Sequence, residues 1–328
     1  MLLHLRVTVP PDRTEQVRAL FDACPGSAHV AVLPGVSVQP AGDLVLADVA
    51  REAVDGLIDD LRELGVDRAG GLSISAVDAA VSDSAERAEE EAPGAGVDAV
   101  VWEEVVRTTA SESSLSVSFL AFLTIATMLA AIAIINDSAI LTIGAMVLGP
   151  EFVPLAALAV AVVQRRPRSA RRAAITLVLG FVVAIGLTAC LTLVGRGLGW
   201  FGTELLGADR PQTGFITHPD KWSLVVAVLA GIAGVLSLTS AKSGALVGVF
   251  ISVTTVPAAA DMAVSLALGG GEEFRTAATQ LGINLAGILV AATLTLAVQR
   301  TIWRRIPGVV PRPGTDRAVT GPTETGRH

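Results

Sequence analysis

The chain has 328 residues, of which 52% are hydrophobic, 17% are charged and none is tyrosine, and its mean hydropathy is +0.61. This composition excludes an ordinary soluble domain of the same length. The formal net charge of −7 is unevenly spread, because acids gather in the first hundred residues and arginines gather in a few short loops.

Neither the cysteines nor the start of the chain indicates an exported protein. Cys24 stands in a polar region and Cys190 in an apolar run, so we do not expect them to pair, and no CxxC motif is present. The opening MLLHLRVTVPPDR has a short apolar run, no basic start and no A-x-A cleavage site. We therefore expect a cytoplasmic N-terminus.

Residues 1–80 read as alternating short strands and helices. Leu2–Val9 alternates as a strand does, and Asp12 or Thr14 is placed to cap a following helix. Further strands are expected at His29–Leu33, Asp43–Val49 and Leu72–Val77, on either side of an amphipathic helix at Arg51–Leu64 that stops at Gly65. The order β-α-β-β-α-β predicts a small α+β, ferredoxin-like domain with two helices on one face of an antiparallel sheet.

Metal handling by this domain is not expected. Heavy-metal domains of this shape carry CxxC after the first strand, where this chain has Pro10, Pro11 and Asp12. His4 and His29 have no second His or Cys at ligand spacing, so we interpret them as surface or core histidines. We predict no metal and no cofactor.

Residues 81–114 are expected to connect this domain to the apolar region. The acidic SDSAERAEEEAPGAG indicates a solvated linker, and its consecutive glutamates lack the spacing of a calcium loop. The next stretch, VDAVVWEEVVRTTASESS, places valines on one side of a helix. Such a helix suits the membrane surface or couples the soluble domain to the first span.

Residues 115–305 contain six segments long enough to cross a bilayer, at about 20 residues per span. They are about Leu115–Ile135, Ser138–Val163, Ala173–Val194, Trp222–Ala241, Ser243–Leu268 and Ala277–Arg300. Only the second and fifth carry a charge in their interior, Glu151 and Asp261. Residues 306–328 are predicted to form a disordered cytoplasmic tail.

Arginine placement predicts the orientation of these spans in the cell inner (plasma) membrane. The loop RRPRSARR and the tail after the last span are rich in arginine, which indicates the cytoplasm. The loop 195–221 and GGGEEFR are balanced or acidic and suit the outside. With six spans, both termini are then cytoplasmic.

An internal repeat, residues 115–195 and 222–300, appears at an offset near 103. Arg172 and Thr176 fall on Arg275 and Thr279 at that offset. LTIGAMVLGPEFVPLAALAVA lies over LVGVFISVTTVPAAADMAVSLA, which pairs Gly144 with Gly248 and, after a shift of one residue, Pro154 with Pro257. Three spans per half predict two inverted halves with broken middle helices, a design frequent in secondary transporters. The alternative is a duplicated scaffold without transport, in which the prolines only kink helices.

The broken middle spans supply the candidate site. A proline break in hydrocarbon persists only where protein or a wet cavity satisfies the backbone, and an ionisable residue there is a functional candidate. Glu151 could instead lie hydrated near one face of the bilayer. The candidate pathway residues are Glu151, Asp261, Pro150, Pro154, Pro257, Asn284, Gly144, Gly248, Thr254 and Thr255.

Small and polar residues elsewhere are expected to serve packing. Glycines of the last three spans, Gly231, Gly234, Gly244, Gly248, Gly282 and Gly287, favour close helix contact or an oligomer. Asn136 and Asp137 are expected to cap the second span.

Several stretches carry a resemblance to a known family. SAILTIGAMVLGPEFVPLAAL, RRPRSARRA, HPDKWSLVVAVLAGIAGVLSLT, SGALVGVFISVTTVPAAADMAV and QLGINLAGILV, spread over Leu115–Val298, resemble the domain-of-unknown-function family 389, the uncharacterized hydrophobic domain proteins of bacteria and archaea. The N-terminal region is similar to the soluble domain of a subgroup. The resemblance implies no activity, substrate or catalytic residue. Glu151 departs from the apolar residue that many relatives show there.

Two hypotheses about function follow. The first is a secondary transporter or channel-like protein for a small solute or ion, coupled to a proton or cation through Glu151 or Asp261 and regulated by the N-terminal domain. The second is a non-transporting sensor or scaffold whose soluble domain binds a ligand or partner. The membrane part lacks HExxH, GxGD and GxSxG, so no enzyme is predicted. The lipid bilayer, a small solute and further copies of the chain are the expected partners, and nucleic acid is not.

Overall fold

The structure is a computed structural model that describes residues 1–92, 100–112, 114–207, 210–214, 221–239 and 255–303. The described chain divides into two compact units, which we call unit 1 (Met1–Pro93) and unit 2 (Gly94–Arg305). The predicted tail, 306–328, lies outside the described residues.

Unit 1 has a four-stranded antiparallel sheet in the order β2-β3-β1-β4. Its strands are β1 (Leu2–Val9), β2 (Ser27–Val38), β3 (Ala41–Ala50) and β4 (Gly71–Ala76). Its first helices are α1 (Thr14–Ala23), α2 (Arg51–Glu63) and the short α3 (Val66–Ala69). The predicted β-α-β-β-α-β order is present. Gly65 follows the end of α2 and has a positive φ of 70°.

The core of unit 1 follows from two periodicities. Alternate residues of β1 are buried, namely Leu3, Leu5, Val7 and Val9. The apolar stripes of α1 and α2 cover them with Val17, Phe21, Val54, Leu57, Ile58 and Leu61, all buried. Each such side chain stabilises the fold by about 1.5–3 kcal/mol relative to exposure.

The β2–β3 hairpin is longer than predicted. The stretch LPGVSVQPAGD, expected as a turn-rich connection, continues both strands, with Ser37 opposite Gly42 and Val38 opposite Ala41. Pro34 is tolerated because β2 is an edge strand, where a missing N–H breaks no ladder bond.

The predicted cap of α1 is wrong. Arg13 occupies the N-cap position of α1 without a side-chain hydrogen bond. The Thr14 hydroxyl instead donates to Asp43 Oδ2 at 2.6 Å, and Gly35 N–H donates to Asp43 Oδ1 at 2.8 Å. Asp43 therefore ties α1 to the hairpin.

The acidic stretch expected as a linker contains a helix, α4 (Asp83–Glu91). Ser82 caps it by accepting a hydrogen bond from Ala85 N–H. Three alanines spaced along its acidic sequence are buried against Leu2, Ala28 and Ala50, namely Ala85, Ala88 and Ala92. Charges dominate the composition here, but the alanines lie on one side of the helix and decide the packing.

Unit 2 is helical. Its described helices are α5 (Trp102–Glu112), α6 (Val117–Ile135), α7 (Ala139–Leu148), α8 (Phe152–Val163), α9 (Pro167–Gly197), α11 (Lys221–Thr239), α13 (Val256–Leu268) and α14 (Gly271–Trp303), with the 3-10 turn η1 (Thr203–Leu205). By length and composition, four of the described helices can cross a membrane (α6, α9, α11 and α14), or five if the bent pair α7 and α8 forms one span. These apolar helices indicate a membrane protein.

Of the predicted fifth span, Ser243–Leu268, only the second half is described, as α13. Gly248 and Thr254 lie outside the described residues. Six spans therefore remain an expectation.

Helix α5 is not confined to a surface, as one alternative expected. Val100 and Val105 are buried against Val160 of α8 and Leu296 of α14. Its apolar face therefore belongs to the helix bundle of unit 2.

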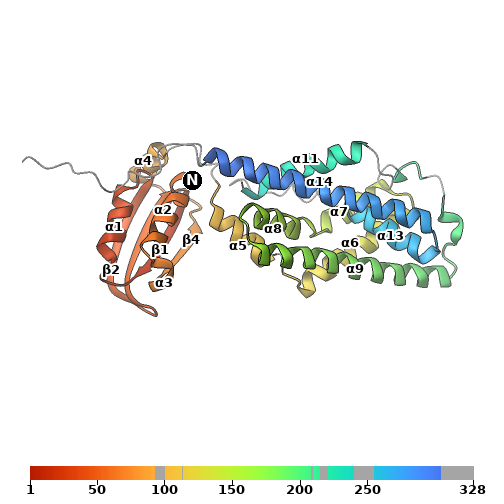
Figure 1. The fold of residues 1–328 in the computed structure, drawn as a ribbon, viewed down its shortest axis with the longest axis horizontal. Helices are drawn as coiled ribbons and strands as arrows, with labels where there is room; N and C mark the ends of the chain where they lie inside the picture. The colour runs from red at the N-terminus through yellow and green to blue at the C-terminus, as the bar shows by residue number, and fades with distance from the viewer. Residues whose placement is uncertain (93–99, 113, 208–209, 215–220, 240–254, 304–328) are drawn as a thin grey trace, which may run out of the picture. The chain divides into compact units, whose positions relative to one another are not determined.

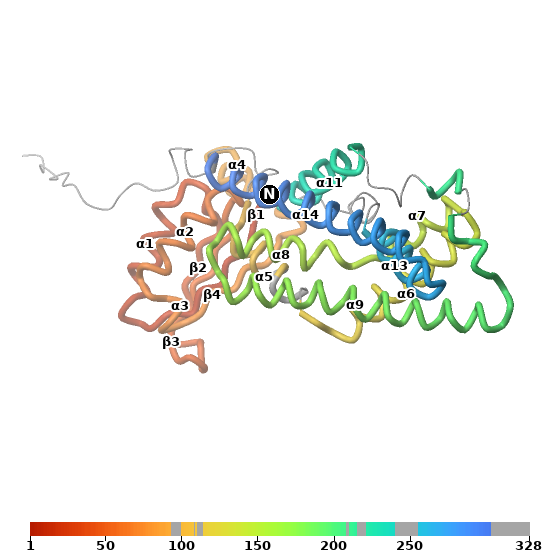
Figure 2. The backbone as a smooth tube through the Cα atoms, turned by 45° about the vertical axis from the view of Figure 1, so that its right-hand side comes forward, coloured from red at the N-terminus to blue at the C-terminus, as the bar shows by residue number. Residues whose placement is uncertain are grey.

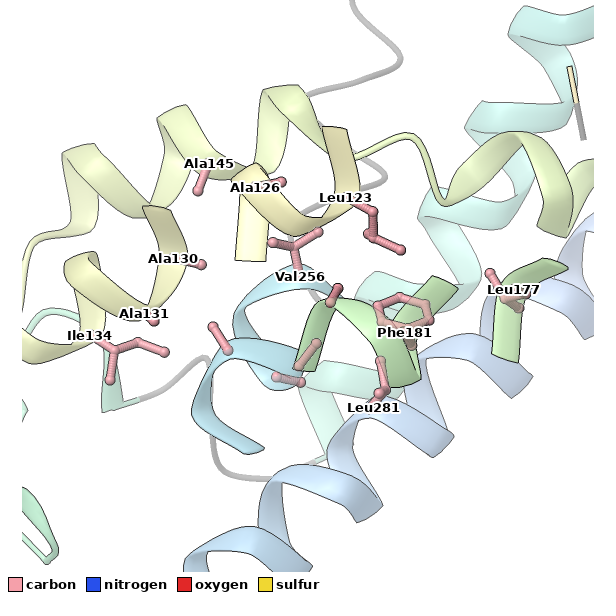
Figure 3. Packing of buried hydrophobic residues seen from close by; sticks show 14 of the residues in the cluster. Leu123, Ala126, Ala130, Ala131, Ile134, Ala145, Leu177, Phe181, Val256 and Leu281 are labelled. Atoms are coloured by element: carbon pink, nitrogen blue, oxygen red, sulfur yellow. The ribbon is translucent and has the colours of Figure 1, made fainter. Parts of the chain in front are cut away.

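Two long helices, α9 and α14, run the length of unit 2, with α8 toward one end and α13 toward the other (Figure 1). Figure 2 shows the same order along these helices from a second direction. Helix α8 packs against α9 and α14, and α13 packs against α14, α9 and α6. In the core cluster, Val256 of α13 lies beneath Ala126 of α6, and Phe181 of α9 lies beside Leu281 of α14 (Figure 3).

The Asp43 contact predicts a pH effect in unit 1. Hydrogen bonds from Thr14 and Gly35 hold the pKa of Asp43 below its usual range. A lowered folded-state pKa gives a stabilisation that is complete above the unfolded value of about 3.9 and is lost as the pH falls toward the folded value. Protection of the β2–β3 hairpin from hydrogen exchange, corrected for the intrinsic effect of pH, should therefore decrease below about pH 4.

Thr14→Val should weaken this pH dependence and lower protection at pH 7, whereas Thr14→Ser keeps the donor and serves as the control. An unchanged pH dependence in Thr14→Val would contradict the role of this contact.

Candidate functional site

The break between α7 and α8 has a local cause. Pro150 has no N–H and disfavours helical backbone at Gly149, which is extended with ψ of 119°. Helix α8 then begins at Phe152, and the two helices are bent by 51°. The break predicted at Pro150 is present.

The two paired prolines begin helices and do not kink them. Pro154 is the third residue of α8, and Pro257 is the second residue of α13. The first N–H groups of a helix have no partner within it, so a proline there removes no intrahelical bond. Both prolines thus lie in the first turns of the described helices α8 and α13 and not in their interiors.

The N-terminal ends of α8 and α13 meet at one buried hydrogen bond. Glu151 and Thr255 occupy the two N-cap positions, and both side chains are fully buried. The Thr255 hydroxyl donates to Glu151 Oε1 at 2.5 Å. A helix N-terminus carries a partial positive charge, so both ends attract the Glu151 carboxyl group when it is ionised.

This contact lies about midway along the bundle. Helix α9 has 31 residues and is about 46 Å long, and α8 and α13 are about 18 and 20 Å long at 1.5 Å per residue. The two short helices run away from the contact toward opposite ends of unit 2 (Figures 1 and 2).

Two arginines bind the far ends of these short helices. Arg300 of α14 donates to the Val163 carbonyl at the end of α8, at 2.7 Å. Arg196 of α9 donates to the Ala267 carbonyl near the end of α13, at 3.3 Å. A cation at a helix C-terminus satisfies a carbonyl and interacts favourably with the dipole. We call these two contacts the arginine clasps.

Asp261, the second predicted carboxylate, does not join Glu151. It lies six residues after Thr255 in α13, about 9 Å along the helix. Asp261 Oδ1 forms a buried ion pair with Arg210 at 2.9 Å, and Arg210 also donates to the Leu205 carbonyl. Arg210 was not predicted as this partner, because it stands in a polar loop 51 residues before Asp261.

Other candidates have different surroundings. Asn284 is fully buried in α14, one turn after the buried Gln280. A Cβ added at Gly144 would meet nothing within 4 Å, so no close approach requires glycine there. In contrast, a Cβ at Gly231 would lie 2.6 Å from the Ile288 carbonyl oxygen, which confirms the predicted close packing for that glycine.

The turn between α6 and α7 differs from its prediction. Ser138 caps α7 by accepting from Leu141 N–H. Asp137 instead accepts hydrogen bonds from Gln212 N–H and from the Thr213 N–H and hydroxyl at 2.8–3.2 Å. Burial would raise the pKa of Asp137, but these hydrogen bonds outweigh it and lower the pKa.

Unit 1 contains a polar cluster that the sequence did not predict. Asp48 accepts from Nδ1 of His4 and of His29, each at 2.7 Å, and His29 Nε2 lies 2.8 Å from the Ser82 hydroxyl and 3.0 Å from that of Ser84. His29 has a positive φ of 53° at an irregularity of β2. Burial would raise the pKa of Asp48, but the histidine bonds lower it. Among the described residues, no group of three metal-binding side chains is present.

Comparison with known proteins finds a match that includes the site. Residues 146–290, less than half of the chain, match the family model described as Domain of unknown function (DUF389). A protein of Methanocaldococcus jannaschii described as uncharacterized is 26% identical over 211 residues, or 63% of each chain. This chain therefore spans less than two thirds of that relative's length. No solved structure matches this chain.

The DUF389 match confirms the resemblance read from the sequence. It includes the break at Pro150, the Glu151–Thr255 contact and Asp261, and it ends before Arg300. The buried contact thus lies within the matched residues, whereas one arginine clasp uses a residue beyond them.

Removing the Thr255 hydroxyl should destabilise unit 2. Thr255→Val keeps the shape but takes away the donor to Glu151, at a cost of about 1–3 kcal/mol. The midpoint of thermal unfolding in detergent should fall by about 2–4 °C for each kcal/mol. Thr255→Ser retains the hydroxyl and should unfold near the wild-type temperature; equal midpoints for the Val and Ser variants would show that the bond contributes nothing.

Proposed function

We propose that residues 115–305 form a secondary transporter or channel-like protein for a small solute or ion. The observation that carries this proposal is the meeting of the α8 and α13 N-termini at the buried Glu151–Thr255 contact, midway along an apolar bundle. Short helices that begin near the bilayer midplane with their positive ends at one spot are a recurring design of transporter binding sites.

The proposal includes six spans arranged as a 3+3 inverted repeat. Equivalent helices begin 104 residues apart: α8 and α13 at Phe152 and Val256, and α9 and α14 at Pro167 and Gly271. This spacing is one residue longer than the offset read from the third and sixth spans. Contacts also correspond, since α8 packs on α9 and α14 while α13 packs on α14 and α9.

The arginine clasps support the same symmetry. Arg196 and Arg300 are 104 residues apart, and so are their acceptors, Val163 and Ala267. Each long helix therefore binds the end of the short helix from the other half. Exchange of partners of this kind is expected when a two-fold axis in the membrane plane relates the halves.

Glu151 is the residue to which we assign proton or cation coupling. A buried carboxyl group near the midplane is costly to keep charged, so such residues are retained mainly where they bind a coupling ion. Protonation would remove the charge that the two helix ends attract, so that an anionic group of a solute could take its place beside Thr255. Asp261 would act separately, by holding the 205–214 segment to α13 through Arg210.

The setting of this protein belongs to the same proposal. We place it in the plasma membrane with both termini in the cytoplasm, surrounded by lipid and associated with further copies of itself. Unit 1 would regulate transport, and no catalytic reaction is assigned to the chain.

A non-transporting sensor or scaffold is the second candidate. The cluster of Asp48, His4 and His29 with Ser82 favours it, because a strained, partly exposed histidine is a feature of binding sites in soluble domains. In that case unit 1 binds the ligand and unit 2 serves as the anchor. Deleting residues 1–80 separates the two: unchanged flux would make unit 1 accessory.

Flux through proteoliposomes tests the transporter directly. The full chain is reconstituted with a pH-sensitive dye inside, and proton entry is followed while a panel of amino acids, sugars and inorganic ions is added outside. Glu151→Gln should lower the coupled flux at least about 100-fold, the lower end of what a positioned acid or base contributes.

Glu272→Gln, at an exposed carboxylate that begins α14, is the matched control and should retain flux. Asp261→Asn should reduce flux less than Glu151→Gln. Wild-type flux in both the Glu151 and Asp261 variants would remove the carboxylates from the mechanism.

The proposed symmetry predicts that loss of either clasp loosens a different short helix. Arg196→Gln should loosen the Leu268 end of α13, and Arg300→Gln should loosen the Val163 end of α8. In a background without Cys24 and Cys190, Ser265→Cys reports on the first end and Ala161→Cys on the second, as both positions are buried and 104 residues apart. Each clasp variant should increase thiol labelling by an impermeant maleimide mainly at its own end; equal increases at both ends would contradict the assignment.

A further inference from the structure

A groove of about 800 Å³ lies between the start of α6 and the first turns of α9. Ser114 and Leu115 form one wall, and Arg168, Arg171, Arg172 and Ile175 belong to the other. All of these residues are in unit 2, and the groove is open at the surface. The groove is remote in sequence from Glu151 and Thr255 and takes no part in the function proposed above.

The groove carries unneutralised positive charge. Arg168, Arg171 and Arg172 are exposed, and no carboxylate among the described residues forms an ion pair with any of them. They stand on the first two turns of α9, which begins at Pro167, so the helix dipole adds to their field. The occupant that this charge favours is an anion.

The rest of the groove is apolar. Leu115 and Ile175 are each 46% exposed, and Ile175 continues along α9 into the exposed Val178, Leu179 and Val182. A soluble anion would use only the guanidinium groups. A molecule with a charged head and a hydrocarbon chain would use the arginines and the apolar stripe together.

We propose that this groove binds an anionic phospholipid, with its phosphate held by Arg168, Arg171 and Arg172 and one acyl chain lying along Leu115 and Ile175. Guanidinium groups match phosphate oxygens in bidentate geometry, and basic pockets at the ends of membrane helices are suited to such headgroups. The usual excess of arginine in cytoplasmic loops explains the charge but not a groove that joins it to an apolar wall. The inference rests on the membrane location of unit 2 and is independent of transport.

Native mass spectrometry of the full chain in a non-ionic detergent tests the proposal. In such a detergent no anionic membrane surface is present, so the arginines cannot retain lipid by unspecific attraction to a charged bilayer. Phosphatidylglycerol and phosphatidylcholine of the same chain length are titrated separately. The protein should retain phosphatidylglycerol in preference. The triple variant Arg168→Gln, Arg171→Gln, Arg172→Gln should bind it roughly 100-fold more weakly, at about fivefold for each cation.

The matched control is Arg166→Gln, which removes a charge from the same loop without lining the groove and should bind phosphatidylglycerol as the wild type does. Ile175→Glu is a second test should the triple variant fail to fold, since a negative charge on the apolar wall should also weaken binding.

Three outcomes would overturn the proposal. The first is wild-type affinity for phosphatidylglycerol in the triple variant, or in Ile175→Glu in its place. Equal retention of both lipids would show that the phosphate charge is not recognised. Displacement of the lipid by millimolar inorganic phosphate or glycerol phosphate would assign the groove to a soluble anion.

Discussion

The first N–H groups of a helix find no carbonyl within that helix, and α8 and α13 both begin inside an apolar bundle. In hydrocarbon each unsatisfied group costs several kcal/mol. Two features lower this cost at one place: Pro154 and Pro257 each remove one N–H from the first turns, and the Glu151 carboxyl group, bound to Thr255, lies at the positive ends of both helices. The break, the buried carboxyl group and the paired prolines thus answer a single constraint.

The same constraint explains what surrounds the contact. The last carbonyls of the two short helices also need partners, and each arginine clasp satisfies one of them from a long helix. Helices α11 and α14 approach closely at Gly231, where only glycine leaves room for the Ile288 carbonyl, and Gln299 of α14 donates to the Thr239 hydroxyl of α11. Close packing and a few specific polar bonds thus hold the bundle around the central contact.

Much of the fold could be predicted from local patterns in the sequence. The alternation at Leu3, Leu5 and Val7, the helical stripe of α2 and the break at Pro150 were all predictable, because each depends on neighbours within a few residues. Thr255 and Glu151 were both candidates, but their contact joins residues 104 positions apart and no periodicity reveals it. Arg210 at Asp261 and His29 at Asp48 were missed for the same reason. The helix α4 was missed because its charges outnumber the alanines that anchor it.

The Glu151–Thr255 pair also bears on why the proposed halves differ at their centre. Residues at equivalent positions on a two-fold axis face each other, so two glutamates there would place like charges in contact, and two threonines would leave the helix ends without an anion. A carboxyl group from one half and a hydroxyl from the other form a donor–acceptor pair with one titratable site. In the proposed symmetric scaffold the centre is thus where the two sequences are expected to diverge, and this pair then needs one carboxyl group and not two.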